Sequence, residues 1–380
     1  MAWYQNDWAL FGLRNEQLAV ALAADPRVRS VLHLEPPVSE ADLGKTPSPD
    51  QADLFRVQRL RARATMDRQV IAYTPLLQTG DAGRPLNELT WEKVLTQLNA
   101  HHIERPLLWL YPPHFLSAIL LEQLSSAAAA IVADCTDDHL AVFAPGSDAY
   151  HQAEQNYCDC LTAADLVVTT SPPMVKTFGQ WNTATHYLPN ACPPWHGQGQ
   201  AKLQLPEGWP RPRVLFSGNL RSEFDAELTL AVMTALPQLT FVVIGGPPQA
   251  LASALRPLPH VHMLGPRTID DARQIMAQCD LGICPKERSV RADSQSPLKV
   301  FEYLAHDLPV VSTPVAGNDV FGDLVWEATT AADFVAAILA TIRDPRAQSA
   351  KRKAFVAANQ WRHRVDWVLG QLERTMTRWP

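Results

Sequence analysis

The sequence has few of the features that mark membrane, disulfide-rich or nucleic-acid-binding proteins. Its 380 residues include six cysteines with no CxxC pair, which excludes a disulfide framework. No apolar run reaches the roughly 18–20 residues of a membrane span, and the start shows no signal-peptide pattern. The net charge of −6 leaves no overall basic surface for nucleic acid. We therefore expect a cytoplasmic protein without a nucleic-acid partner.

Cofactor and metal motifs are also missing. No GxGxxG motif follows an expected strand, so a dinucleotide-dependent oxidoreductase is not expected. No two aspartates are separated by a single residue, which removes a common metal–diphosphate motif. The sequence YCDC, at residues 157–160, has no matching Cys/His pair nearby, and we interpret its cysteines as structural. We expect neither a cofactor nor a metal site.

The second half of the chain alternates apolar strands with helical patterns. A composition of 47% hydrophobic and 19% charged residues is typical of a globular protein, and the length predicts two or three domains. Continuous apolar runs bounded by Gly and Pro predict a parallel sheet covered on both faces. The expected strands are RVLFSG (213–218), TFVVIGG (240–246), HVHMLG (260–265), LGICP (281–285) and PVVST (309–313), with helices at 249–255 and 269–279.

The first half repeats this alternation less regularly. Strands are expected within residues 30–37, 106–114, 127–135 and 166–173, and helices at 15–24 and 115–124. A stretch rich in Pro, Gly and Gln between the halves reads as a linker. The predicted fold class is α/β, with two doubly wound Rossmann-like domains. The predicted boundaries are 1–190, a linker at 191–212, 213–342, and closing helices at 343–380.

The segment SPLKVFEYLA, which begins at Ser296, combines a helix start with two charges. Ser296 is a favourable N-cap, and Pro297 suits the first helical position. The free N–H groups and partial positive charge of a helix N-terminus favour phosphate, and Lys299 adds a full charge. This pattern predicts an anion-binding helix N-terminus.

Glu302 lies further along the same helix, within an apolar stretch. It follows Pro297 by about 7.5 Å, at roughly 1.5 Å per residue, which is on the order of the span from a diphosphate to a ribose diol. A carboxylate accepts two hydrogen bonds, and a diol donates two. One short helix could therefore bind both ends of a nucleoside diphosphate. The alternative is a Glu that pairs with Lys299 on an exposed face.

A second candidate for chemistry is ADCTDDH, which follows an expected strand in the first half. A carboxylate or histidine that faces a cleft could act as a general base and accept the proton of a hydroxyl. Asp137 or Asp138 could act as this base, with Asp134 or His139 orienting it. The alternative is a loop whose aspartates cap the next helix. His114 and Arg14 also lie near expected loop or helix starts, on what would be the acceptor side.

The stretch SPLKVFEYLAHDLPVVSTPVAG resembles the nucleotide-sugar-binding signature of glycosyltransferases with the GT-B fold. LPNA (188–191), VLFSGNL (214–220) and VHMLGPRTIDDARQIMAQCDLGICP are also similar to that family, so the resemblance covers most of residues 130–317. HLEPP and DCTDDH resemble a bacterial subgroup that builds cell-surface polysaccharides. The family's second Glu, eight positions before the ribose Glu, is replaced by Ser294 here. We therefore make no prediction of inverting or retaining stereochemistry.

The resemblance implies that Glu302 binds the ribose of the donor. The implied donor site also contains Ser296, Pro297, Lys299, Gly218, Asn219, Arg221, Arg267, Lys286 and Arg288. Four of these, Arg221, Lys286, Arg288 and Lys299, replace the Gly-Arg and Lys phosphate clamp that many members carry and that this sequence lacks.

The resemblance implies an enzyme that moves a sugar from a nucleotide diphosphate sugar to a hydroxyl of a glycan or lipid-linked acceptor. The second domain is expected to bind the donor, the first the acceptor, and the reaction to take place in the cleft. A nucleotide-sugar epimerase and a non-catalytic nucleotide-sugar-binding protein remain alternatives. Residues 341–380 carry nine Lys/Arg against three Asp/Glu, which suggests reversible contact with anionic lipid.

Overall fold

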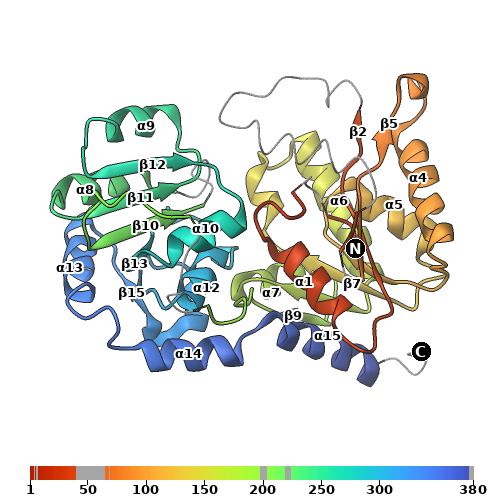
Figure 1. Cartoon of the computed structure of the whole chain (residues 1–380). Coiled ribbons are helices and arrows are strands. Elements are labelled where there is room, and N and C mark those ends of the chain that lie inside the picture. Colours follow the sequence, from red (N-terminus) through yellow and green to blue (C-terminus); the bar gives the residue numbers. More distant parts are fainter. Residues whose placement is uncertain are drawn as a thin grey trace. The chain divides into compact units, whose positions relative to one another are not determined.

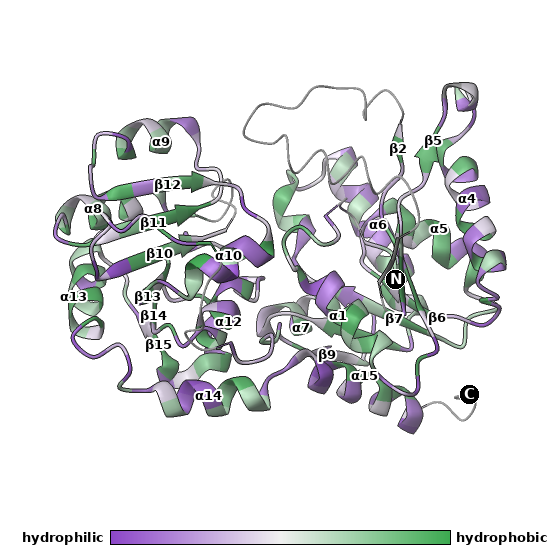
Figure 2. Cartoon of the chain, in the orientation of Figure 1, coloured by the Kyte–Doolittle hydropathy of each residue, from purple (hydrophilic) through white to green (hydrophobic). Residues whose placement is uncertain are grey.

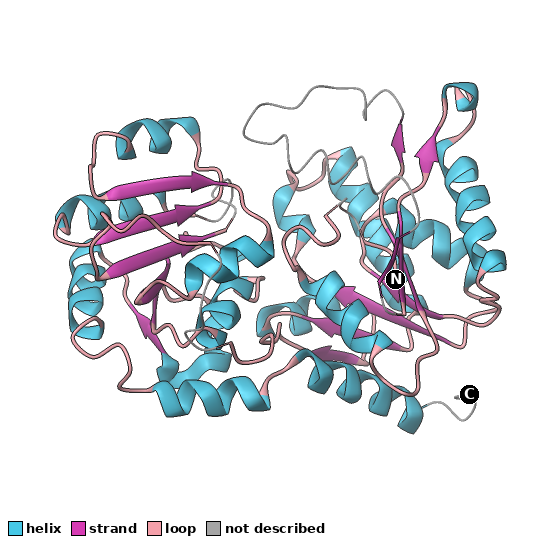
Figure 3. Cartoon of the chain, in the orientation of Figure 1, coloured by secondary structure: helices cyan, strands magenta, loops and turns pink. Residues whose placement is uncertain are grey.

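The computed structural model describes residues 1–3, 5, 7–39, 65–67, 69–196, 203–218 and 224–375. Its contacts divide the chain into two compact units. The first contains Met1–Trp8, Gly12–Leu188 and Arg364–Pro380, and the second contains Ala9–Phe11 and Pro189–His363. Both units combine helices with mostly parallel strands (Figure 3). The fold class is α/β, as the sequence predicts.

The second unit is built on a six-stranded parallel sheet with the order β12-β11-β10-β13-β14-β15 (Figure 1). Its inner strands are mostly apolar and buried, because helices cover a doubly wound sheet on both faces, whereas the edge strands β12 and β15 are only partly buried. The strands are β10 (Arg213–Ser217), β11 (Thr240–Ile244), β12 (Val261–Gly265), β13 (Leu281–Cys284), β14 (Val310–Ser312) and β15 (Val325–Glu327).

The strand order reverses between β10 and β13. From β10 the chain builds outward through β11 to β12, then returns to add β13 on the other side of β10. In open α/β sheets, ligands bind beyond the carboxyl ends of the strands at such a reversal. The topology therefore places the site of this unit where β10 and β13 end.

The helices of the second unit pack as two apolar clusters. One cluster joins buried residues of α12 to strand residues such as Leu215 and Val242, and the other joins α8 and α13 to Phe241 and Val243. The helices are α8 (Ala226–Ala235), α9 (Gln249–Leu255), α10 (Ile269–Met276), α11 (Val290–Asp293), α12 (Leu298–Ala305), α13 (Ala331–Thr341) and α14 (Ser349–Ala358), with the 3-10 segment η4 (Ala316–Leu324).

In the first unit, the N-terminal segment joins two sets of strands. Ala2 forms parallel bridges to Leu34 and to Leu110, so it lies between β1 and β6. The strand sets are β1-β4-β3 and β6-β7-β8-β9, and β2 pairs separately with β5. The strands are β1 (Val31–Leu34), β2 (Val38–Ser39), β3 (Thr65–Asp67), β4 (Val70–Tyr73), β5 (Leu76–Leu77), β6 (Leu107–Leu110), β7 (Ala130–Cys135), β8 (Leu166–Thr169) and β9 (Thr185–Tyr187).

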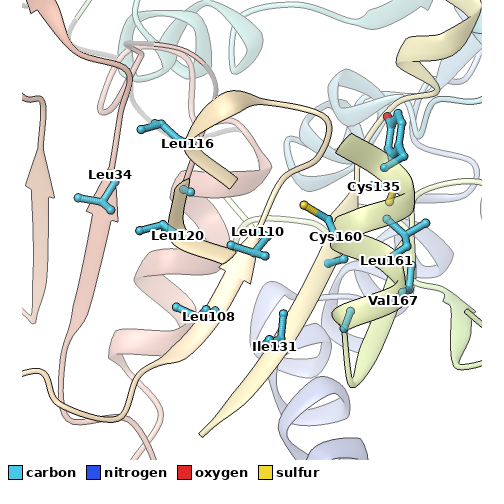
Figure 4. Packing of buried hydrophobic residues seen from close by; sticks show 14 of the residues in the cluster. Leu34, Leu108, Leu110, Leu116, Leu120, Ile131, Cys135, Cys160, Leu161 and Val167 are labelled. Atoms are coloured by element: carbon cyan, nitrogen blue, oxygen red, sulfur yellow. The ribbon is translucent and has the colours of Figure 1, made fainter. Parts of the chain in front are cut away.

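Apolar side chains from these strands and the neighbouring helices form the core of the first unit. Figure 4 shows Leu108, Leu110 and Ile131 of the sheet beside Leu116 and Leu120 of α5. The helical elements are α1 (Arg14–Ala23), η2 (Thr79–Asp81), α4 (Leu86–Ala100), α5 (Phe115–Leu124), η3 (His139–Val142), α6 (Asp148–Ala163), α7 (Pro172–Phe178) and α15 (Trp361–Thr375).

The stretch interpreted as a linker packs on the second unit in its described part. Cys192 is fully buried, and its N–H donates to the carbonyl of Asn359. Leu203 and Leu205 each donate a backbone N–H to a glutamine side chain of the α10 region. This stretch is therefore anchored to the second unit at both of its described ends.

The closing helices divide between the two units. Helix α14 lies in the second unit, and the chain joins the first unit only from Arg364, within α15. Both helices alternate hydrophilic and hydrophobic residues (Figure 2). Trp361 is buried and the ring of Trp367 contacts that of His186, whereas Trp379 lies outside the described residues. None of the helices in the described ranges has the length and apolar character needed for a membrane span.

Candidate functional site

The carboxyl ends of β10 and β11 approach each other through glycine. Gly218, directly after β10, has φ +142° and donates its N–H to the carbonyl of Ile244. A Cβ on Gly245 would lie 2.0 Å from the carbonyl oxygen of Gly218. Only residues without a side chain fit this approach, which leaves backbone groups accessible at the reversal of the strand order.

Helix α12 begins beside this point, one residue later than the sequence indicates. Pro297 is its N-cap, and no side chain caps it, so the prediction of Ser296 as N-cap and Pro297 as first helical residue is wrong. The hydroxyl of Ser296 instead accepts a hydrogen bond from the N–H of Asn190, whose side-chain amide donates to the carbonyl of Ser296. Because the hydroxyl of Ser296 is hydrogen-bonded to Asn190, it does not cap α12.

Lys299 extends from the first turn of α12 over the end of β10. Its Nζ lies 4.6 Å from the centroid of the Phe216 ring, and a Cβ on Gly218 would be 2.8 Å from Nζ. Tyr303 fixes the helix in this place, because its hydroxyl accepts the N–H of Ser217. An ammonium group, a glycine backbone and a helix N-terminus therefore converge, which is an arrangement suited to phosphate.

Glu302 is buried on the same helix and paired with an arginine. Arg273 of α10 donates from Nε to Oε2 at 3.1 Å and from Nη2 to Oε1 at 2.8 Å. Only 3% of the surface of Glu302 is exposed. The alternative of an exposed Glu302–Lys299 pair is therefore wrong. Its partner, Arg273, is not among the predicted site residues.

The remaining donor-side predictions divide into three groups. Lys286, after β13, is buried and donates to the side-chain oxygen of Gln295 at 2.6 Å. Arg267, after β12, is half-buried and donates to the carbonyl of Pro266, while Arg288 is exposed. Asn219 and Arg221 lie outside the described residues. Their predicted contacts with phosphate stay predictions.

In the first unit, Asp134 and Arg14 form a buried ion pair. The Nε of Arg14 lies 3.0 Å from each carboxylate oxygen, and the indole N–H of Trp109 donates to Oδ2. Asp134 is fully buried and Arg14 is 3% exposed. Burial raises the pKa of Asp134, and the guanidinium opposes that shift. The structure therefore does not support orientation of a general base by Asp134, or an acceptor-side role for Arg14.

Four other predicted residues gather at the carboxyl ends of β6 and β7, which are neighbouring strands. The carboxylate of Asp138 accepts the N–H of Leu140, so it caps η3, as the alternative interpretation predicts. Asp137 and His139 are half-buried beside it. Burial and then the nearby charge of His139 lower the pKa of His114 to about 4. The pKa of Asp138 is raised by burial, which favours a proton acceptor at this edge.

Metal-binding groups and cysteines are the other candidates for a site. In the described ranges, no group of three or more His, Cys, Asp or Glu residues is placed to hold a metal ion. The six cysteines are free thiols. Of the two cysteines of YCDC, which we predict to be structural, Cys160 is buried and Cys158 is half-buried.

Comparisons with known proteins agree with this arrangement. Residues 211–344 match the family described as Glycosyl transferases group 1. This segment contains the entire six-stranded sheet together with Lys299 and Glu302. A comparison with curated proteins gives no match.

Solved structures resemble the whole chain. They include sucrose-phosphate synthase from Thermosynechococcus elongatus, with a TM-score of 0.62 at 18% identity over 94% of this chain and 91% of that one. Anabaena HepE, solved in complex with UDP and glucose, has a TM-score of 0.62 at 15% identity over 98% and 99%. Burkholderia multivorans α,α-trehalose 6-phosphate synthase has a TM-score of 0.62 at 14% identity over 98% of each chain.

The chain has the GT-B fold of glycosyltransferases. In this GT-B protein, the sequence does not reveal two residues that contact predicted site residues. Asn190 lies in the LPNA stretch but was given no role, and the partner of its amide is 106 residues away. Arg273 lies 29 residues before Glu302 on another helix, so no local spacing connects them.

Proposed function

We propose that this GT-B protein transfers a sugar from a nucleotide diphosphate sugar to the hydroxyl of an acceptor. The observation that carries the proposal is the placement of Lys299 and Glu302 on one helix at the reversal of the strand order. Lys299 lies over Gly218, where a diphosphate would meet the helix N-terminus. Glu302 follows Pro297 on α12 by about 7.5 Å, at roughly 1.5 Å per residue, which is on the order of the span from a diphosphate to a ribose diol.

The positively charged groups near the start of α12 suit the leaving group of such a transfer. When the bond between the sugar and the diphosphate breaks, negative charge develops on the leaving phosphate. Lys299, Lys286 and the first-turn amides of α12 would stabilise that charge electrostatically. The proposal therefore includes independence from metal ions. Activity should persist in excess chelator, and complete loss that Mg²⁺ or Mn²⁺ restores would contradict this part of the proposal.

The first unit would bind the acceptor. We propose Asp137 or Asp138 as the base that accepts the hydroxyl proton, with His139 and His114 beside them. At least one of the variants Asp137→Asn and Asp138→Asn should lower turnover by about 100-fold or more while nucleotide binding is kept. Full transfer activity in both variants would show that the base lies elsewhere.

For the acceptor, we propose a glycan or a lipid-linked molecule used in surface polysaccharide synthesis. Reversible contact with anionic lipid belongs to it, but Arg352 cannot take part because it is buried against Asp307. Lys353 and Arg362 are exposed and remain available. In flotation with anionic vesicles, a smaller fraction of a Lys353→Gln/Arg362→Gln variant than of wild type should float with the lipid. Equal flotation of the two proteins would refute lipid contact.

The donor site is tested by thermal shift with UDP, GDP, ADP and their sugars. A ligand at 100 times its dissociation constant adds about 2.7 kcal/mol of stability. Glu302→Ala should weaken the binding of that ligand by two charge-assisted hydrogen bonds, each about 1.5–3 kcal/mol. Unchanged binding would remove Glu302 from the site. Sugar isomerisation would instead indicate an epimerase, and binding without turnover a non-catalytic protein.

A further inference from the structure

We infer that Arg273 is a positioning residue that holds the Glu302 carboxylate for the ribose hydroxyls of the donor. This inference rests on the proposed function, because it assumes that a nucleotide binds along α12. Arg273 itself need not touch the nucleotide. It acts by fixing the group that does.

The hydrogen bonds of the pair leave capacity for a ligand. Arg273 donates one hydrogen bond to each oxygen of Glu302, at 3.1 and 2.8 Å. An ionised carboxylate has about four acceptor positions, so one position remains on each oxygen. A vicinal diol offers two O–H donors. The pair as a whole therefore presents the acceptors that a ribose diol requires.

Burial explains why an arginine is needed at this position. The side chain of Glu302 is 4% exposed, and a buried carboxylate is costly unless it is paired and hydrogen-bonded. Lys299, the cation that α12 itself carries, extends over Phe216 and Gly218 instead. The guanidinium of Arg273 therefore compensates the charge of Glu302, while Lys299 is left for phosphate.

The pair also fixes the direction of the carboxylate. A bidentate guanidinium–carboxylate contact restricts rotation of both groups, which a single hydrogen bond from an ammonium does not. Arg273 belongs to α10, which precedes β13, and Glu302 belongs to α12, which follows β13 after the short helix α11. The contact thus ties the carboxylate to a second helix that packs against the sheet. Such preorganisation lowers the entropic cost of ligand binding.

The test compares ribose with dideoxyribose ligands. Calorimetry would measure the dissociation constants of UDP, GDP and ADP, each beside its 2′,3′-dideoxy form. The proteins are wild type, Arg273→Met, Arg273→Lys and Arg256→Met, the last a control for loss of an exposed arginine in the same unit. Arg273→Met should weaken the ribose form of the bound nucleotide about 10-fold or more, comparable to one charge-assisted hydrogen bond. The dideoxy form should bind unchanged.

Arg273→Lys keeps the positive charge and one donor nitrogen. Its loss of nucleotide affinity should therefore be smaller than that of Arg273→Met, and again limited to the ribose form. This variant decides the question if Arg273→Met lowers the unfolding temperature. Equal weakening of both ligand forms would mean that Arg273 only maintains the fold. Tighter binding would mean that it competes with the ligand for Glu302. Either result overturns the inference and leaves the proposed function standing, whereas wild type that binds none of the three nucleotides overturns both.

Discussion

The ion pair between Arg14 and Asp134 allows a structural role to be separated from a catalytic one. Asp134 lies in the ADCTDDH sequence that predicts catalysis, but its carboxylate is fully buried. It receives the Nε of Arg14 at 3.0 Å on both oxygens and the indole N–H of Trp109. We expect Asp134→Asn to act on stability first, with any loss of activity following from that.

The magnitude follows from what the substitution leaves behind. Asparagine preserves the shape of the side chain but removes its charge, so the buried guanidinium of Arg14 loses its carboxylate partner. Breaking a buried pair in this way costs about 3–5 kcal/mol. Replacing both partners by apolar residues of similar volume, as in Arg14→Met with Asp134→Leu, is often neutral or stabilising. The double variant should therefore regain most of the lost stability.

Hydrogen exchange with mass spectrometry suits a protein of two units, because each unit is measured separately. In Asp134→Asn, peptides from β7 and β8 should exchange at much lower denaturant concentration, whereas peptides from β10 and β11 serve as the internal reference. Asp159→Asn, an exposed change on α6, is the matched control and should stay within about 0.5 kcal/mol of wild type.

The opposite pattern would refute this reasoning. If Asp134→Asn exchanges as wild type does but loses turnover, the carboxylate takes part in the chemistry despite its burial. If the double variant is less stable than the single one, the ion pair contributes more than the apolar replacement, and the estimate of its net value is wrong.

Three other predictions concern glycine geometry, a second buried pair and pH. Gly245→Ala should lower the stability of the second unit by at least about 1–3 kcal/mol, measured by hydrogen exchange, because alanine is strained at φ +124° and its Cβ would lie 2.0 Å from the carbonyl oxygen of Gly218. Arg352→Gln should cost about 3–5 kcal/mol through the loss of its pair with Asp307, whereas Lys353→Gln, an exposed change, should be nearly neutral. The lowered pKa of His114, about 4, means that the unfolded chain binds the proton more readily, so stability should fall as pH drops from about 6.5 towards 4. His114→Asn, which keeps an acceptor for the cap, should flatten that slope in urea titrations at several pH values.

Much of the second unit could be predicted from the sequence because its signals are local. The strand expected at 213–218 is observed at Arg213–Ser217, and the strand expected at 281–285 at Leu281–Cys284. Continuous apolar runs bounded by Gly and Pro permit few other interpretations. Helix α5 was likewise expected at residues 115–124 and is found there.

The parts that were missed depend on partners far along the chain. The start of α12 was misplaced because Asn190 occupies the hydroxyl of Ser296, a contact across 106 residues. The sequence pattern places Asp134 among the candidate catalytic aspartates and does not indicate its ion pair, since its partner Arg14 is 120 residues away. Buried ion pairs of this kind leave no local spacing. The alternation of apolar strands with helical patterns is also less regular in the first unit, and the sequence pattern does not predict β4 (Val70–Tyr73).

The membership of α15 in the first unit has a consequence for how the protein is made. Arg27 pairs with Asp366 and Glu373, and His186 contacts Trp367, so early and late parts of the chain meet here. Val368, Leu369 and Leu372 of this helix are fully buried. During translation, the whole second unit is synthesised before α15. The apolar surface of the first unit that packs against α15 therefore stays uncovered until then. A ribosome-bound chain that ends near Leu188 should therefore need chaperone protection, although its strands are already complete.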